Sequence, residues 1–359
     1  MGRLLISEKV ENIKPYIVDK REYEVKLDAN ESFIPFPKVL ENELKEAAVR
    51  VLYNRYPDPD AEELCRLYGD YCGIASKYVM AGNGSDELIQ ILVNGFLDKE
   101  DSLLTIKPDF SMYKFYASLI GAKVVEYDMG EDLVFDRDGF MEMARVNNAK
   151  LVIFSSPNNP TGGIIPREDI LYIVQNADAL VVVDEAYFEF YGETVIDKIS
   201  EYENLAVLRT CSKAVGLAAA RVGFLIAGEK VIGSARKIKP PFNVNSLSQA
   251  AAAVVLKHRE VIDGNVEQIK TGRDMLYRAL TELQITYGKE IIRVFPTYAN
   301  FVYVKSPAAA QIFEELKEAG IIIRCFGDYL RINTGSTKEN ELFIDNFSKF
   351  VRLHSGADA

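Results

Sequence analysis

The chain has 359 residues, 48% of them hydrophobic, and a formal net charge of −11 at pH 7. This length exceeds what one hydrophobic core usually serves, so we expect more than one domain, and the apolar content excludes a disordered chain. The acidic balance argues against a nucleic-acid partner, which needs a basic surface. No apolar run approaches the roughly 20 residues that span a bilayer, and no secretory signal opens the chain. We therefore expect a soluble protein with no membrane partner.

Four cysteines and two histidines are scattered along the chain. Cys65 and Cys72 stand seven residues apart, which is not the CxxC spacing of a zinc or redox site, and two histidines cannot complete a soft-metal cluster. We expect no metal, and reduced thiols in a cytoplasmic protein. Cys211 adjoins Ser212 and Lys213; oxidation sensitivity is one interpretation, and an ordinary structural thiol is the favoured one.

Seven short apolar runs have the composition of buried parallel strands. They cover residues 77–82, 102–106, 123–128, 151–156, 179–185, 205–210 and 223–228. Helical periodicity appears between several of them, as over 86–97 and 112–122. This alternation predicts an α/β domain with a mostly parallel seven-stranded sheet, whose ligands bind beyond the C-terminal ends of the strands.

The adjacent prolines Pro240 and Pro241 predict a domain boundary. We expect a large domain over residues 36–240 and a smaller α+β domain over 241–359. Residues 1–35 are expected to form an N-terminal arm that joins the small domain.

The segment from 209 to 224 places Ser212 and Lys213 directly after an apolar run, and Arg221 follows eight residues later. A lysine at the end of a buried strand has a lowered pKa, which makes its amine a nucleophile. A hydroxyl and a guanidinium nearby suit a phosphate group. The combination fits an aldehyde cofactor with a phosphate tail, pyridoxal phosphate, although Lys213 alone is more simply read as a solvated lysine.

Asp184 ends another apolar run, where a buried carboxylate needs a cationic partner such as a protonated pyridine nitrogen. A helix N-cap is the simpler alternative. Tyr187 and Asn159 could each reach the ring oxygen of such a cofactor, and Pro160 predicts a cis peptide bond that aims Asn159.

Two further segments have both a functional and an ordinary interpretation. Ser85 and Asp86, after Gly84, would present backbone N–H groups to an anion at a helix start, or would only cap that helix. Phe110 offers a flat face against which a pyridine ring could stack, or it belongs to the core.

In this order along the chain, the elements resemble those of the fold-type I pyridoxal-phosphate aminotransferases, and in particular the histidinol-phosphate aminotransferase family. The finer resemblance rests on LDANES (27–32), NRYPDPD (54–60), GNGSDE (82–87) and RTCSKAVGLAAARVGF (209–224). Two positions depart from the family: Phe110 stands where tyrosine is frequent, and Ala218–Ala220 replaces a glycine-containing stretch before Arg221.

The resemblance implies that Lys213 binds the cofactor aldehyde and moves a proton during the reaction, while Asp184 holds the pyridine nitrogen. Asn159 and Tyr187 would bind the ring oxygen. The groups around the cofactor phosphate would be Ser85, Asp86, Ser212 and Arg221.

The resemblance also implies substrate and partner contacts. Arg331 resembles an arginine that holds a substrate carboxylate or equivalent anion, and Arg324 a second one available for a substrate phosphate. Tyr16 and Asn30 match positions that close over the substrate, although an anchoring surface aromatic is nearly as good an interpretation of Tyr16. Tyr56 would reach the phosphate across a subunit interface, which implies a homodimer with shared active sites.

The implied reaction is the transamination of L-histidinol phosphate with 2-oxoglutarate to imidazole-acetol phosphate and L-glutamate, in histidine biosynthesis. An aromatic amino-acid aminotransferase is the nearest alternative, and a threonine-phosphate decarboxylase the third. A regulator built on an inactive aminotransferase fold would need an appended DNA-binding domain, and a dinucleotide oxidoreductase would need GxGxxG after its first strand. The chain shows neither feature.

Overall fold

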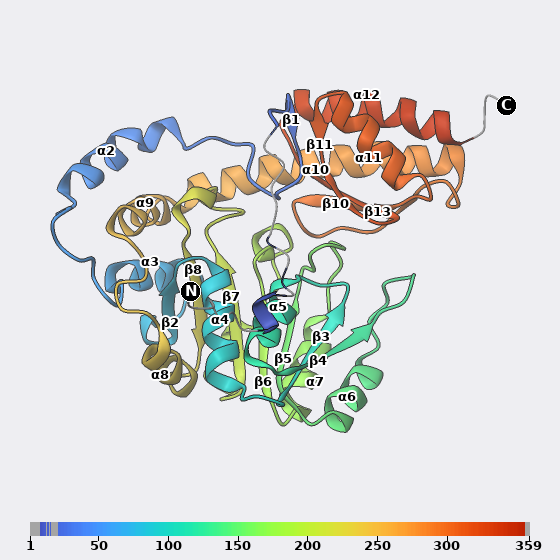
Figure 1. Ribbon diagram of the computed structural model, residues 1–359. Coiled ribbons are helices and arrows are strands. Elements are labelled where there is room, and N and C mark those ends of the chain that lie inside the picture. The colour runs from blue at the N-terminus through green and yellow to red at the C-terminus, as the bar shows by residue number, and fades with distance from the viewer. Residues whose placement is uncertain (1–7, 12, 14, 16–20, 356–359) are drawn as a thin grey trace, which may run out of the picture.

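The computed structural model describes residues 8–11, 13, 15 and 21–355, so the predicted contact of Tyr16 lies outside the described residues. Figure 1 shows a large domain built around one sheet and a smaller domain beside it. The long helix α10 (Arg259–Tyr287) runs from the first to the second (Figure 1). Within the described residues, no helix is both long and apolar enough to cross a membrane.

The large sheet has seven strands in the order β2-β8-β7-β6-β5-β3-β4. They are β2 (Val79–Gly82), β3 (Ser102–Lys107), β4 (Lys123–Asp128), β5 (Ala149–Ser155), β6 (Leu180–Asp184), β7 (Leu205–Thr210) and β8 (Gly223–Ala227). Each overlaps one of the predicted apolar runs. Only β8 runs antiparallel to its neighbours β2 and β7. The prediction of a mostly parallel seven-stranded sheet is confirmed.

Helices cover both faces of this sheet, which explains why its strands are apolar throughout. In β6, Val181 and Val183 pack into one core, and Leu180 and Val182 pack into the other. The helices against the first core are α3 (Glu62–Cys72), α6 (Arg137–Val146), α7 (Arg167–Asn176) and α9 (Ser246–Leu256). Those against the second are α4 (Ser85–Phe96), α5 (Met112–Ile120) and α8 (Glu229–Ile238).

The small domain has a four-stranded sheet in the order β12-β13-β10-β9. Its elements are β9 (Arg293–Val294), β10 (Phe301–Lys305), α11 (Ala309–Glu318), β12 (Arg324–Phe326), β13 (Tyr329–Asn333) and α12 (Thr337–His354). Near the N-terminus, β1 (Val25–Lys26) pairs in parallel with β11 (Ile321–Ile322). Val25 and Leu27 are buried in the small-domain core, which supports the proposal that the N-terminal arm joins this domain.

In the part of the chain that the structure describes, the remaining elements are two α-helices and five short 3-10 helices. They are α1 (Glu8–Glu11) and α2 (Glu41–Arg50), with η1 (Lys38–Leu40), η2 (Ser76–Tyr78), η3 (Phe188–Phe190), η4 (Ile196–Lys198) and η5 (Ala218–Ala220). Helix α2 has no buried residue and lies at the edge of the large domain (Figure 1).

Side-chain packing favours a domain boundary later than Pro240. Helix α9 and the first half of α10, through Ile262 and Ile269, belong to the large-domain core. Leu276 and Leu280, further along α10, belong to the small-domain core. We therefore propose a boundary within α10, between residues 269 and 276, in place of residue 240.

Candidate active site

An anion-binding arrangement forms where α4 begins. No side chain caps the first backbone N–H groups of α4, so these groups can donate to an anion in front of the helix. Arg221 Nη1 donates to Ser212 Oγ at 3.3 Å, and Arg221 Nη2 lies 3.7 Å from Asp86 Oδ2. The structure thus brings together Ser85, Asp86, Ser212 and Arg221, the four residues expected around a phosphate.

Glycine is required in this arrangement at two positions. Gly84 has φ +83°, and a Cβ there would stand 2.6 Å from Arg221 Nη2. A Cβ on Gly223 would stand 2.5 Å from the backbone nitrogen of Ser85. Side chains at either position would displace the arginine or the helix start, so both glycines keep the site open for an anion.

Lys213 lies three residues beyond β7 and is half-buried. Its Nζ donates to the Ala29 carbonyl at 3.2 Å and lies 5.9 Å from the centre of the Tyr187 ring. Burial lowers the pKa of Lys213 to about 8, and the positive charge of Arg331 acts in the same direction. A larger neutral fraction of this amine is therefore present near pH 7 than for an ordinary lysine, which makes it a nucleophile.

Asp184 ends β6 with its side chain buried. The Tyr113 hydroxyl donates to its Oδ2 at 2.8 Å, and the Ala186 N–H donates to its Oδ1 at 3.1 Å. Burial raises the pKa of Asp184 to about 6, although these two hydrogen bonds oppose the shift. The carboxyl is therefore mostly ionised at pH 7 and can balance a buried positive charge.

A second group of polar side chains joins the two domains. Arg331, in β13, donates through Nη1 to Asn159 Oδ1 and through Nη2 to the Asp28 carbonyl at 2.7 Å. Asn30 donates to the Tyr187 hydroxyl at 2.8 Å. The peptide bond between Asn159 and Pro160 is cis, as predicted. Since Asn159 uses its oxygen for Arg331, its amide N–H₂ group is the part available to a ligand.

The other expected residues are placed less directly. Phe110, half-buried, lies in the loop after β3, with its ring centre 5.7 Å from that of Tyr113. Arg324 is the cross-strand partner of Arg331 in the β12–β13 pair. Tyr56 is 81% exposed and stacks on Phe242, so within one chain it does not join the site.

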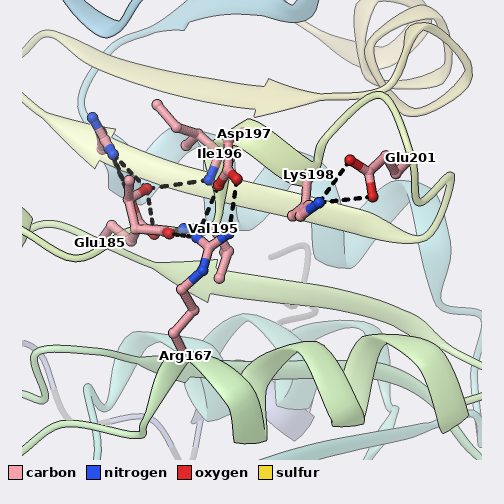
Figure 2. A network of polar contacts seen from close by, with 9 residues as sticks. Arg167, Glu185, Val195, Ile196, Asp197, Lys198 and Glu201 are labelled. Carbon is pink, nitrogen blue, oxygen red and sulfur yellow. Dashed lines mark hydrogen bonds and ion pairs between the residues drawn. The ribbon is translucent and has the colours of Figure 1, made fainter.

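A buried ion pair that the sequence reasoning missed lies next to Asp184. The carboxylate of Glu185 accepts from Arg209 Nη2 at 2.7 Å, and both side chains are almost fully buried. Thr194 donates to the same carboxylate. Arg167 binds Asp197, three residues beyond Thr194 (Figure 2). Removing one partner of such a pair costs about 3–5 kcal/mol, so Glu185 anchors the strand end that carries Asp184.

Comparison with known proteins gives the family. The model of the family described as "Aminotransferase class I and II" matches residues 22–347. The chain belongs to this family. It is 43% identical over 341 residues to the histidinol-phosphate aminotransferase of Clostridium novyi, covering 94% of each chain. The enzyme of that name from Clostridium kluyveri is 42% identical over 353 residues, covering 97% of this chain and 99% of the relative.

Solved structures agree on the fold of this aminotransferase. The histidinol-phosphate aminotransferase of Sinorhizobium meliloti, in complex with pyridoxal-5'-phosphate, has a TM-score of 0.87 at 22% identity, covering 97% of this chain and 98% of that one. An aspartate aminotransferase of Thermus thermophilus bound to maleate has a TM-score of 0.81 at 20% identity, covering 98% of this chain and all of that one. Because members with different substrates share the fold, the fold alone does not select the substrate.

Proposed function

We propose that this aminotransferase acts on L-histidinol phosphate, a step of histidine biosynthesis. It exchanges the amino group of this substrate for the keto oxygen of 2-oxoglutarate, giving imidazole-acetol phosphate and L-glutamate. The observation that carries the proposal is the 42–43% identity to relatives with this name over almost the whole of both chains.

The residues present fit pyridoxal phosphate as the cofactor. The uncapped start of α4, with Arg221 and Ser212, offers donors to its phosphate. Asp184 is a buried carboxylate that would hold the protonated pyridine nitrogen, and Tyr113 fixes its orientation. Asn159 and Tyr187 would donate to the ring oxygen. When bound, the cofactor supplies an electron-withdrawing ring that stabilises negative charge on the substrate carbon.

Lys213 has two tasks in this proposal. Its amine, with a pKa near 8, is the nucleophile that would bind the cofactor aldehyde. When it is not bound to the cofactor, Nζ would take the proton from the substrate carbon as a general base and later give it back as a general acid. Its contact with the Ala29 carbonyl, on the N-terminal arm, links this proton carrier to the segment expected to close over the substrate.

Two arginines would select the substrate. Arg331 is buried, and the Asp28 carbonyl and Asn159 fix its guanidinium, so it suits an anion held in one position. Arg324 stands opposite it across the strand pair. We assign Arg324 to the phosphate of L-histidinol phosphate and Arg331 to the carboxylate of 2-oxoglutarate or the equivalent anion.

The assignment of Arg324 predicts unequal losses. In Arg324→Ala, kcat/KM for L-histidinol phosphate should fall about 10- to 100-fold, because one charge-assisted contact to the phosphate is lost. The value for L-phenylalanine, which has no phosphate, should change less than about threefold. Arg278→Ala, at an exposed position of α10, is the matched control and should behave as wild type. Equal losses for both substrates in Arg324→Ala would contradict the assignment.

We further propose a homodimer in which Tyr56 contacts the cofactor phosphate of the partner. Large apolar side chains are exposed along one continuous segment, namely Val39, Val49, Leu52, Tyr53 and Tyr56. Exposed apolar surface of this extent is typical of an interface. Sedimentation of the purified protein should therefore give about twice the chain mass of 40.3 kDa. A monomer at micromolar concentration would contradict the dimer.

We also propose that the protein works in the cytoplasm. All four cysteines are free thiols, which is the state expected in a reducing compartment.

A further inference from the structure

Asp109 lies in the loop between β3 and α5, next to Phe110, and accepts three hydrogen bonds. Its Oδ1 accepts from the Phe110 N–H at 2.8 Å and from the Ser155 hydroxyl. Its Oδ2 accepts from the Ser155 N–H at 3.0 Å. Because β3 and β5 are parallel neighbours, this one carboxylate joins the loop after β3 to the C-terminal end of β5.

Ser155 extends the contact to Asn159. A serine hydroxyl has one proton, and this one is donated to Asp109, so the oxygen is left as an acceptor. It accepts from the Asn159 N–H at 3.1 Å and from Asn158 Nδ2 at 3.1 Å. Asn158 Nδ2 also donates to the Pro108 carbonyl at 3.3 Å, which adds a second hydrogen-bonded link between the loops that follow β3 and β5.

The protonation state of Asp109 sets the strength of these contacts. Burial raises the pKa of Asp109 to about 8; its three hydrogen bonds oppose this shift, and the negative charge of Asp184 adds to it. Burial also raises the pKa of Tyr113, followed by the charges of Asp184 and Asp109, so the three groups form one cluster. Hydrogen bonds to an ionised carboxyl are roughly twice as strong as neutral ones. The contacts of Asp109 with Ser155 and Phe110 are therefore strongest above pH 8, where its carboxyl is mostly ionised.

We propose that Asp109 is a positioning residue of the cofactor site, which fixes Phe110 and the Asn159 loop relative to each other through Ser155. Asp109 itself touches neither cofactor nor substrate in this account. The proposal rests on the proposed function, since it requires that pyridoxal phosphate contacts both Phe110 and Asn159.

Asp109→Asn tests the proposal in the holoenzyme at pH 8.5. An asparagine has one acceptor oxygen, so in either orientation its N–H₂ group opposes the N–H of Ser155 or of Phe110. We expect the dissociation constant for pyridoxal phosphate to rise about tenfold, and the visible circular dichroism of the bound cofactor to change at saturation. The second readout follows the orientation of the cofactor ring, which a loss of stability alone would not alter.

Ser155→Ala tests the connection to Asn159. It should shift both readouts in the same direction, and the double variant should be no worse than the more damaged single one, because both act through one path. Should Asp109→Asn fail to fold, Ser155→Ala still decides the matter by the same two readouts. Asp128→Asn is the matched control, since this exposed carboxylate binds Lys107, the last residue of β3, at 3.1 Å; it should resemble wild type.

The outcomes separate this proposal from the proposed function. A wild-type protein that binds no pyridoxal phosphate would refute the function and this inference with it. Normal cofactor binding in wild type, with an unchanged affinity and dichroism in Asp109→Asn or Ser155→Ala, would overturn only the role of Asp109. Strictly additive effects in the double variant would also overturn it.

Discussion

Replacing Lys213 with alanine is expected to lower transaminase turnover by at least about 10³-fold. The variant loses both the nucleophile for the cofactor aldehyde and the carrier of the substrate proton, and general acid–base catalysis alone contributes about 10²–10⁴-fold. The phosphate-binding groups at the start of α4 remain, so cofactor should still bind. It should bind without the absorbance change that accompanies a covalent link to a lysine.

Lys77→Ala is the control for this variant. Lys77 forms an exposed ion pair with Glu229 at 2.6 Å and should tolerate the change with normal turnover. The measurements are turnover with L-histidinol phosphate and the visible absorbance of each protein with added pyridoxal phosphate. Turnover of Lys213→Ala at the wild-type rate would end the whole functional account.

Replacing Asp184 with asparagine is expected to lower kcat by about 10²–10³-fold, the typical loss when one fixed electrostatic group is removed from an active site. Asparagine keeps the size of the side chain but removes the negative charge that would hold the pyridine nitrogen protonated. Because Asp184 is buried, water cannot reach this position and stabilise the positive charge in place of the carboxylate.

Tyr113→Phe separates the charge of Asp184 from its orientation. This change removes the hydroxyl that donates to Asp184 at 2.8 Å and leaves the charge in place. We expect a loss of about tenfold, clearly smaller than that of Asp184→Asn. Stopped-flow measurement of the half-reaction with L-histidinol phosphate gives both values. An Asp184→Asn variant with wild-type kcat would contradict the role of the carboxylate.

Much of the large domain could be predicted from local sequence. Strands buried on both faces must be apolar at every position, so runs such as Leu205–Thr210 are recognisable without tertiary information. The change of domain could not be predicted in this way. Pro240 and Pro241 mark the chain turn between α8 and α9, but α9 packs back against α2 and α3 in the large-domain core, and only side-chain packing shows this.

The site was predictable where its residues end parallel strands. Asp184 ends β6 and Lys213 follows the neighbouring strand β7, and the C-terminal ends of such strands meet at one edge of the sheet. Tyr113, Asp109 and Arg209 were missed because their partners lie 71, 46 and 24 residues away along the chain. Polar residues next to apolar segments are expected to have a buried partner. The sequence does not identify that partner, because it is brought close only by the fold.

The measurement that tests the central claim most directly compares kcat/KM for L-histidinol phosphate, L-phenylalanine and L-glutamate in one coupled assay with the cofactor-loaded protein. We predict a preference for L-histidinol phosphate over L-phenylalanine of at least about 100-fold, because a site built to hold a phosphate rejects a substrate that has none. Comparable or better use of L-phenylalanine would contradict the account and identify an aromatic amino-acid aminotransferase.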